Sequence, residues 1–295
     1  MRLILVGSVI VDLVLPVAAL PERGGDVLAI GGGFRVGGGM YVLRAAAAAG
    51  AATAYAGHVG TGPFGDQVRS ALARLGTDVL LDPDPSADTG VCVVLVEPDG
   101  ERTFITRPGA EAHLDAPDLA PLTVLPADTV YVSGYDLVYD GFGTALARWL
   151  SRLDPSATLA VDLGPLVAEI PGAVLDQTLA RTDICTLNRR EWALLTRADN
   201  VAAAAAALSA RLAPQALVVL RDGARGATIS GGEFGESVVH IPAPQVEAGD
   251  TTGAGDVHTG TLLGALMMGQ TPEAACRAAN EAAAAHVARA DCADR

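Results

Sequence analysis

The sequence is short of cysteine, aromatic and basic residues, and each shortage narrows what the protein can be. Cys92, Cys185, Cys276 and Cys292 form no CxxC pair and have no histidine nearby at zinc-binding spacing. We therefore expect reduced, mostly structural thiols in a cytoplasmic protein. Aromatic residues are only 4% of the chain, while alanine and glycine are abundant, which suits closely packed helices on a sheet. A net charge of −14 argues against a nucleic-acid or anionic-membrane surface.

Long hydrophobic runs are also missing. The alanine run at 202–207 is too short to cross a membrane, and residues 1–7 read as a core strand rather than a signal peptide. Half of the 295 residues are nevertheless apolar. The chain can therefore bury a large core, either as one large α/β domain or as a domain with a small appendage.

Short apolar runs alternate with helical patterns along most of the chain. Strands are expected at 3–6, 54–59, 130–132, 159–161, 184–187 and 217–220. Helices are expected at 41–49, 65–75, 143–153, 174–180, 191–196 and 201–212. This alternation predicts a doubly wound, mostly parallel sheet with helices on both faces, in one domain that spans residues 1–295.

Two segments have a β pattern that breaks this rhythm. Residues 91–96 and 102–106 flank Glu97-Pro98-Asp99-Gly100, which is a strong hairpin signal. The glycine-punctuated stretch before Gly39 also alternates like a strand. We expect these segments, about 13–36 and 89–108, to pair into a small β-sheet that projects as a lid.

The most informative motif is Asp250-Thr251-Thr252-Gly253-Ala254-Gly255-Asp256. Its small residues let backbone N–H groups approach an anion, and the helix expected at 257–268 would point its positive N-terminal end at that anion. A carboxylate beside phosphate is disfavoured unless it accepts a proton from a substrate hydroxyl. The motif therefore indicates phosphoryl transfer, and the structural alternative is a capped helix after a glycine turn.

Three further motifs lie at the ends of predicted strands, namely Gly57-His58-Val59-Gly60, Asn188-Arg189-Arg190-Glu191 and Arg221-Asp222-Gly223-Ala224-Arg225-Gly226. Together with the 250–256 motif, they resemble the PfkB/ribokinase family of carbohydrate kinases over nearly the whole chain. The hairpin text at 97–104 is similar to the lid of a bacterial subgroup known only broadly as sugar kinases. The resemblance implies a ribokinase-like fold that uses ATP and Mg²⁺ to phosphorylate a primary hydroxyl of a sugar or a sugar-like compound.

The resemblance also assigns roles at the reacting end of the site. Asp256 would be the general base, and the amides of Gly253, Ala254 and Gly255 would stabilise charge on the transferring phosphoryl group. Metal binding would fall to Asn188 and Glu191, which would hold Mg²⁺ through water.

On the nucleotide side, Gly223 and Gly226 would lie under the ATP phosphates and ribose. Arg221 belongs to the same turn, and Asn280 would lie near the adenine. Asp250 and Thr252 would offer backbone carbonyls to a monovalent cation such as K⁺, a site found in part of the family.

On the sugar side, Asp12 and the backbone of Gly37, Gly38 and Gly39 would bind hydroxyls. The family usually carries an asparagine just after the glycine pair, but here that position falls on Tyr41 or Val42. A hydrogen bond to the sugar is therefore absent or altered, which puts a ribose- or fructose-type substrate in doubt. A tyrosine can donate its hydroxyl or stack on a ring, so a nucleoside is the runner-up substrate.

Several of these residues could instead have a purely structural role. Asp12 could cap a turn, and Asn188 with Glu191 has capping-box spacing, which is compatible with a metal role. Arg221 and Arg225 could be solvated turn residues. The two histidines near the motifs, His58 and His258, read as pocket-wall or packing residues.

Two other classes of function stay open: a non-catalytic sugar or nucleotide sensor, and a nicotinamide dehydrogenase. The intact Asp256 and anion motif disfavour the sensor, and the absence of GxGxxG after residues 3–6 disfavours the dehydrogenase. The lid would leave an exposed β-face, which predicts a homodimer. The chain stops at Arg295, so the family's closing segment is expected to be short.

Overall fold

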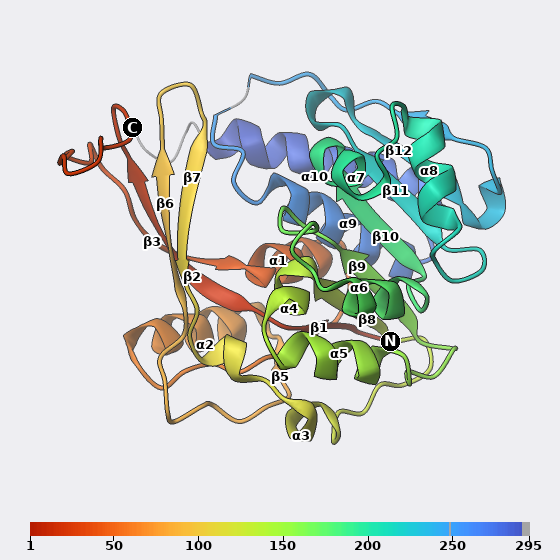
Figure 1. Cartoon of the computed structure of the whole chain (residues 1–295), viewed down its shortest axis with the longest axis horizontal. Coiled ribbons are helices and arrows are strands. Elements are labelled where there is room, and N and C mark those ends of the chain that lie inside the picture. Colours follow the sequence, from red (N-terminus) through yellow and green to blue (C-terminus); the bar gives the residue numbers. More distant parts are fainter. Residues whose placement is uncertain (248, 291–295) are drawn as a thin grey trace.

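A sheet of nine strands runs through the centre of the computed structural model, which describes residues 1–247 and 249–290 (Figure 1). The strand order is β13-β12-β11-β10-β9-β8-β1-β4-β5. The strands are β1 Leu3–Val6, β4 Thr53–Ala56, β5 Asp78–Val79, β8 Thr129–Ser133, β9 Thr158–Asp162, β10 Ile184–Asn188, β11 Leu217–Arg221, β12 Ala227–Gly231 and β13 Val239–Ile241. All pairs from β11 to β5 are parallel, and β12 and β13 add an antiparallel edge. The predicted mostly parallel sheet is confirmed.

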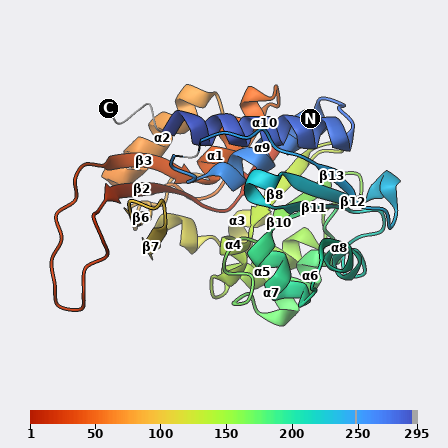
Figure 2. The ribbon, with the colours of Figure 1, turned by 90° about the horizontal axis from the view of Figure 1, so that it is seen from above.

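Helices cover both faces of this sheet (Figure 2). One face carries α1 Gly39–Ala48, α2 Pro63–Leu75, α9 Ala254–Met267 and α10 Pro272–Ala290. The other carries α3 Ala116–Leu119, α4 Gly134–Val138, α5 Phe142–Leu150, α6 Gly172–Leu179, α7 Arg189–Thr196 and α8 Val201–Ser209. Successive strand residues face opposite ways, so Ile4 and Val6 belong to one buried cluster while Leu3 and Leu5 belong to the other.

A second sheet of four strands stands beside the first, at the left of Figure 1. Its order is β3-β2-β6-β7, with β2 Val9–Pro16, β3 Gly33–Gly38, β6 Val91–Val96 and β7 Arg102–Arg107. The predicted small sheet is confirmed, but it begins at Val9, before the expected boundary at residue 13. The strand-like alternation expected between the glycine groups at 24–25 and 31–33 is wrong. Residues 17–32 form no strand, and Leu28 and Ile30 are 86% and 78% exposed. The N–H of Ile30 donates to the carbonyl of Pro16 at the end of β2, at 2.9 Å, but the pairing does not continue from there.

Glycines fix where two functional helices begin. Gly38 has φ of 58° and precedes α1, and Gly253 has φ of 74° and precedes α9. Both angles lie in the left-handed region that favours glycine. Each helix therefore starts earlier than its apolar pattern predicted, at Gly39 and at Ala254. Among the described residues, no helix combines the length and the apolar character needed to cross a bilayer.

Candidate active site

A cavity of about 360 Å³ lies where the carboxyl ends of the parallel strands meet the small sheet. This edge is where open α/β sheets bind ligands. Its walls come from both sheets and from the starts of α1, α7 and α9. The lining residues are Ser8, Ile10, Asp12, Gly38, Gly39, Tyr41, Cys92, Arg102, Phe104, Thr106, Tyr131, Ser133, Tyr135, Tyr139, Pro165, Asn188, Glu191, Thr251, Thr252, Gly253 and Asp256.

Asp256 lies in the first turn of α9 and lines this cavity. Burial raises the pKa of its carboxyl group to about 7, and the negative charge of Asp162 adds to the increase, while Arg221 opposes it. A carboxyl group with a pKa near neutral pH is suited to proton transfer under physiological conditions.

The loop at 250–256, called here the anion loop, keeps several N–H groups unused. Among the described residues, no hydrogen-bond acceptor is found for the N–H groups of Gly253, Gly255 and Asp256. The N–H of Ala254 instead donates to the carbonyl of Thr251 at 3.2 Å. Unused N–H groups at a helix start form an anion-binding site. Of the three amides predicted to contact the phosphoryl group, those of Gly253 and Gly255 are therefore free to bind an anion. The amide of Ala254 is occupied by its hydrogen bond within the loop.

Arg221 occupies the end of β11 beneath the anion loop. It is buried, and its Nη2 lies 2.9 Å from Asp162 Oδ2 and 3.6 Å from Glu191 Oε2. Although burial opposes it, these two carboxylates raise the pKa of Arg221. A Cβ on Gly255 would lie only 2.7 Å from Arg221 Nη1, so the guanidinium group packs directly against the loop. The interpretation of Arg221 as a solvated turn residue is wrong.

Arg225, unlike Arg221, fits the interpretation as a solvated turn residue. Its side chain is exposed and pairs with Asp222, three residues earlier, at 2.7 Å. Such an exposed pair adds little to stability. Arg225 is therefore a solvated turn residue, as the sequence suggested.

Asn188 and Glu191 form a capping box at the start of α7 and also line the cavity. Asn188 Oδ1 accepts from the Glu191 N–H at 3.0 Å, and Glu191 Oε2 accepts from the Asn188 N–H at 2.7 Å. Burial and the nearby Asp162 raise the pKa of Glu191. The capping interpretation is confirmed, and both side chains still reach the cavity.

The metal prediction depends on indirect contact, and the donor set is consistent with it. Within the described ranges, no group of three or more histidine, cysteine, aspartate or glutamate side chains could hold a metal ion directly. Glu191 already accepts two hydrogen bonds from Asn188, through Oε2 at 2.7 Å and through Oε1 at 2.6 Å. Mg²⁺ keeps several waters when bound, so these residues fit a hydrated ion better than a dehydrated one.

Asp12 marks the other end of the cavity, in the middle of β2. It is buried, and burial raises its pKa to about 6 against the effect of Arg35 on the paired strand β3. A Cβ on Gly37 would collide with its carboxylate, so Gly37 makes room for Asp12. The interpretation of Asp12 as a turn cap is wrong because it lies inside a strand.

Tyr41 projects from α1 into the cavity between the two sheets. A Cβ on Gly253 would lie 2.9 Å from its ring, and His286 of α10 meets the ring edge-on with centroids 5.8 Å apart. Burial and the charge of Asp12 raise the pKa of Tyr41 to about 12. Tyr41 is therefore a neutral phenol packed against the anion loop.

Two arginines of the small sheet hold the first residue of the anion loop. Arg35 and Arg102 lie 3.4 and 3.7 Å from the carboxylate of Asp250, and Arg102 also donates to Thr252 Oγ1 at 3.2 Å. Although burial opposes it, hydrogen bonds from Thr252 and these charges lower the pKa of Asp250. Neither arginine was predicted as a site residue from the sequence. The available signal was that both lie in the segments predicted to form the lid, at 13–36 and 89–108.

The residues predicted for the nucleotide lie outside this cavity. Gly223 and Gly226 form the turn between β11 and β12, with φ of 56° and 97°. A Cβ on Gly226 would lie 2.2 Å from the carbonyl oxygen of Ile241. Asn280 of α10 is buried and donates to that same carbonyl at 2.9 Å. Gly226 and Asn280 thus both pack against Ile241, and the contact of these residues with a nucleotide stays a prediction.

Neither histidine near the motifs lines the cavity. His258 is buried and bonds Asn280 through Nε2 at 3.2 Å. His58 lies 3.1 Å from Asp118. His286 was given no role from the sequence, yet its Nε2 donates to the Thr252 carbonyl at 2.7 Å. Spacing cannot reveal that contact because α10 is far along the chain from the loop.

The aromatic wall of the cavity was also missed. Tyr131 of β8 lines the cavity, as do Tyr135 of α4 and Tyr139 at the end of α4. Phe104 of β7 comes from the opposite side. These tyrosines could have been suspected from their place in the sequence, because residues at and just after the end of a parallel strand collect at the ligand-binding edge of the sheet.

The three described cysteines, Cys92, Cys185 and Cys276, are free and buried, as expected, and Cys292 lies outside the described residues.

Comparison with known sequences gives a single consistent result. A family model described as pfkB family carbohydrate kinase matches residues 2–294. An uncharacterized sugar kinase of Escherichia coli K12, YegV, is 33% identical over 274 residues, covering 90% of this chain and 81% of the relative. A fructokinase of Klebsiella pneumoniae is 30% identical over 275 residues, covering 90% and 85%.

Solved structures share the fold. A ribokinase of Thermotoga maritima has a TM-score of 0.82 at 23% identity, covering 98% of this chain and 93% of that one. A fructokinase of Vibrio cholerae, solved with fructose, ADP and a calcium ion, has a TM-score of 0.77 at 22% identity, covering 97% and 93%. The ribokinase-like architecture is therefore confirmed.

Proposed function

Because the chain belongs to the pfkB family of carbohydrate kinases, we propose that it transfers the γ-phosphoryl group of ATP to a primary hydroxyl of a sugar. The enzyme class, a phosphotransferase with an alcohol acceptor, follows from the family. The single observation that carries the finer proposal is the position of Asp256. It combines a pKa near 7 with unused backbone N–H groups at the start of the same helix.

In this mechanism, Asp256 accepts the proton of the substrate hydroxyl as the hydroxyl oxygen attacks the phosphorus atom. The bond from that phosphorus to the bridging oxygen of ADP breaks, and ADP leaves with the electron pair. The N–H groups of Gly253 and Gly255 face the transferring group and stabilise its oxygens. Arg221 adds a fixed positive charge beneath the loop, held in place by Asp162.

Mg²⁺ would neutralise charge on the nucleotide phosphates when bound. Asn188 and Glu191 would hold its water shell, as their capping geometry and their position in the cavity allow. A related fructokinase binds ADP and a metal ion, which supports the same pair of ligands here. The proposed use of ATP and the buried free cysteines among the described residues support a cytoplasmic location.

Asp12 and the glycines at the start of α1 would orient the sugar. The buried carboxyl group can accept hydrogen bonds from hydroxyls, and Gly37 leaves it room. A nucleoside is the second candidate substrate. The observation that favours it is the aromatic wall of Tyr131, Tyr135 and Phe104, which can pack against a base.

We treat residues 1–295 as one kinase domain with the small sheet as its lid. The contacts of Arg35 and Arg102 with Asp250 support this, because they link the small sheet to the anion loop across the cavity. Closure would exclude water and limit ATP hydrolysis. Hydrogen exchange tests it: amides of β6 and β7 should gain protection with substrate, and full protection in the free protein would rule out a moving lid.

ATP consumption measured against a panel of sugars and nucleosides tests the function. Asp256→Asn keeps the shape of the side chain but removes the proton acceptor, so turnover of the true substrate should fall ~10²–10⁴-fold. The control is Asp176→Asn, an exposed residue of α6 that lines neither cavity. A loss below about tenfold for Asp256→Asn would show that another group takes the proton.

A further inference from the structure

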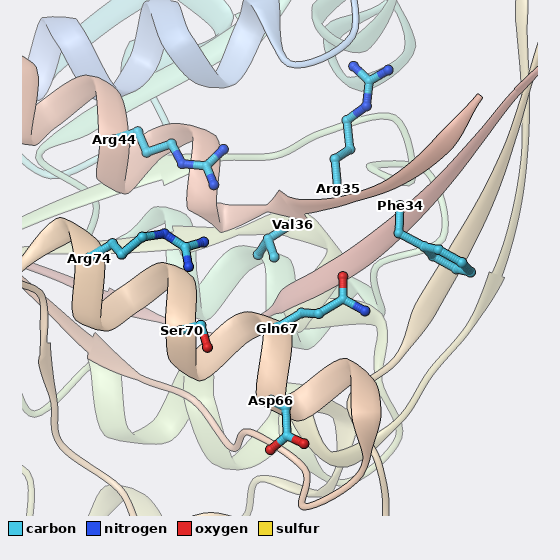
Figure 3. Close-up of a pocket in the computed structure, with 8 residues that line it drawn as sticks. All are labelled: Phe34, Arg35, Val36, Arg44, Asp66, Gln67, Ser70 and Arg74. Atoms are coloured by element: carbon cyan, nitrogen blue, oxygen red, sulfur yellow. The ribbon is translucent and has the colours of Figure 1, made fainter. Parts of the chain in front are cut away.

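A second cavity, of about 500 Å³, lies outside the catalytic cavity among α1, α2 and β3 (Figure 3). It shares no lining residue with the catalytic cavity. Its lining is mainly polar, with one aromatic and one aliphatic side chain from β3. The lining residues are Phe34, Arg35, Val36, Arg44, Asp66, Gln67, Ser70 and Arg74.

Two of the four charged residues here are already neutralised by partners. Arg35 pairs with Asp250 at 3.4 Å, and Asp66 pairs with Arg69. In Figure 3 the Asp66 carboxylate points away from the arginines. The charge of the cavity therefore comes from Arg44 and Arg74.

Arg44 and Arg74 direct their guanidinium groups into the same space (Figure 3). In the part of the chain that the structure describes, neither forms an ion pair with a carboxylate. Burial lowers the pKa of Arg44, and the charge of Arg74 acts in the same direction. Both side chains are exposed, so solvent screens much of the repulsion between the two like charges. A bound anion would offset the remainder.

We propose that this cavity binds the phosphoryl group of a small phosphorylated metabolite between Arg44 and Arg74. A guanidinium group presents a planar fork of donors that matches phosphate oxygens. Ser70 and Gln67 lie on the same side of α2 and offer a hydroxyl and an amide to the remaining oxygens. Phe34 and Val36 supply an apolar wall for the rest of an ester.

The cavity is connected to the catalytic site through two elements. Helix α1 carries Arg44 on this side and Tyr41 into the catalytic cavity. Strand β3 carries Arg35, which lines the phosphate cavity and contacts Asp250 of the anion loop. A bound anion would thus be placed to act on α1 and β3, so this is a candidate effector site rather than part of the substrate site.

Titration calorimetry with inorganic phosphate and with ribose 5-phosphate, at constant ionic strength, tests the proposal. Arg44→Gln with Arg74→Gln should weaken one binding event at least about tenfold, because two charged donors are lost. The control is Arg148→Gln, which removes an exposed arginine from the last turn of α5 just as Arg74 lies in the last turn of α2. The control should bind like the unmodified protein. Any phosphate held at the anion loop should be retained in all variants.

Equal affinity in the double variant and the unmodified protein would overturn the site. Tighter binding of ribose 5-phosphate than of inorganic phosphate would show that the apolar wall contacts the organic part of a phosphate ester. Equal binding of the two would show that the site recognises free phosphate. A double lysine variant keeps both charges but loses the fork, and it should bind with intermediate affinity. Phosphate should also raise the Tm of the unmodified protein but not that of the glutamine variant. These readouts do not depend on kinase turnover, so they can fail independently of the proposed function.

Discussion

His286 donates a hydrogen bond from Nε2 to the carbonyl oxygen of Thr252, with the two atoms 2.7 Å apart. In an uninterrupted helix, that carbonyl would accept from the N–H of Asp256, four residues later. Among the described residues, no acceptor is found for the Asp256 N–H. His286 thus engages the carbonyl and leaves an amide of the anion loop available. The bond also competes with the monovalent cation that the resemblance assigned to Thr252.

We expect His286→Ala to lower kcat about tenfold or more, because the freed carbonyl can draw the Asp256 N–H away from the phosphoryl group. K⁺ should partly restore the rate in this variant by taking over the carbonyl, whereas tetramethylammonium should not. The unmodified enzyme should turn over equally in both salts. Steady-state kinetics tests this role. The control is His113→Ala, which removes a half-exposed histidine that pairs with Asp84. Equal kcat in His286→Ala and the control would contradict the role.

The pKa of Asp256 predicts the pH dependence of turnover. Since its carboxyl group must be ionised to accept a proton, kcat/KM should rise with pH through about 7 and then level off. In Asp256→Asn, the residual rate should lose this step. The pH profile of kcat/KM for the substrate found by screening checks the assignment. An unchanged step near pH 7 in the variant would place the titrating group elsewhere.

The same pKa predicts a pH-dependent stability of the ligand-free protein. The native state holds the proton of Asp256 up to about pH 7, while the unfolded chain releases it near 3.8. The native state therefore binds more protons between these values, so this contribution to stability is lost as pH rises through 7. At pH 8, Asp256→Asn should melt at least about 2 °C above the unmodified protein. The gap should narrow toward pH 4, and a gap that does not change with pH would contradict the prediction.

Gly253 and Gly76 form a matched pair for testing the anion loop. Both have left-handed φ, 74° and 72°, but a Cβ on Gly253 would lie 2.9 Å from the Tyr41 ring while a Cβ on Gly76 meets no atom within 4 Å. Alanine at either position carries a backbone cost of ~1–2 kcal/mol. Only Gly253→Ala should also lose ATP turnover, because the loop must shift away from Tyr41. Equal kcat in the two variants would show that the loop tolerates a side chain.

Local pattern was enough to predict the sheet and the glycine turn that precedes α9, but not the network beneath that turn. Asn188 and Glu191 are three residues apart, so their capping box is visible in the sequence. Arg221 looks like a turn residue because its partners, Asp162 and Thr259, are 59 and 38 positions away. Its burial depends on three elements meeting at one edge of the sheet. The contact of His286 with Thr252 was hidden for the same reason, since α10 returns to the loop only in the folded chain.

The small sheet shows a second limit of prediction from the sequence, which is that alternation alone does not determine a strand. The hairpin was predicted at 91–106 because turn residues separate two strand-like runs, and it is observed at 91–107. Residues 17–32 carry a similar alternation but form no strand. Alternation shows only that one face could be buried, and a strand also needs a neighbour with which to pair its backbone. In this region β3 takes the available edge of β2, and the preceding residues extend beyond it.

The small sheet leaves an apolar outer face, and we predict that it makes the protein a homodimer. Strand alternation turns Val91, Val93 and Leu95 outward, where they are half-buried, and Ile105 on the paired strand is 62% exposed. A four-stranded sheet that covers a site with one face gains stability if a second copy covers the other.

Sedimentation at micromolar concentration should show one species near twice the 29.9 kDa chain. Ile105→Asp would bury a charge in that interface, so it should shift the protein to monomer. The matched control is Leu194→Asp, an aliphatic residue of α7 that is 46% exposed and distant from the small sheet. The control should stay dimeric. A single species near 30 kDa for the unmodified protein, with and without substrate, would rule the dimer out, and the outer face of the lid would then be exposed to solvent in the working enzyme.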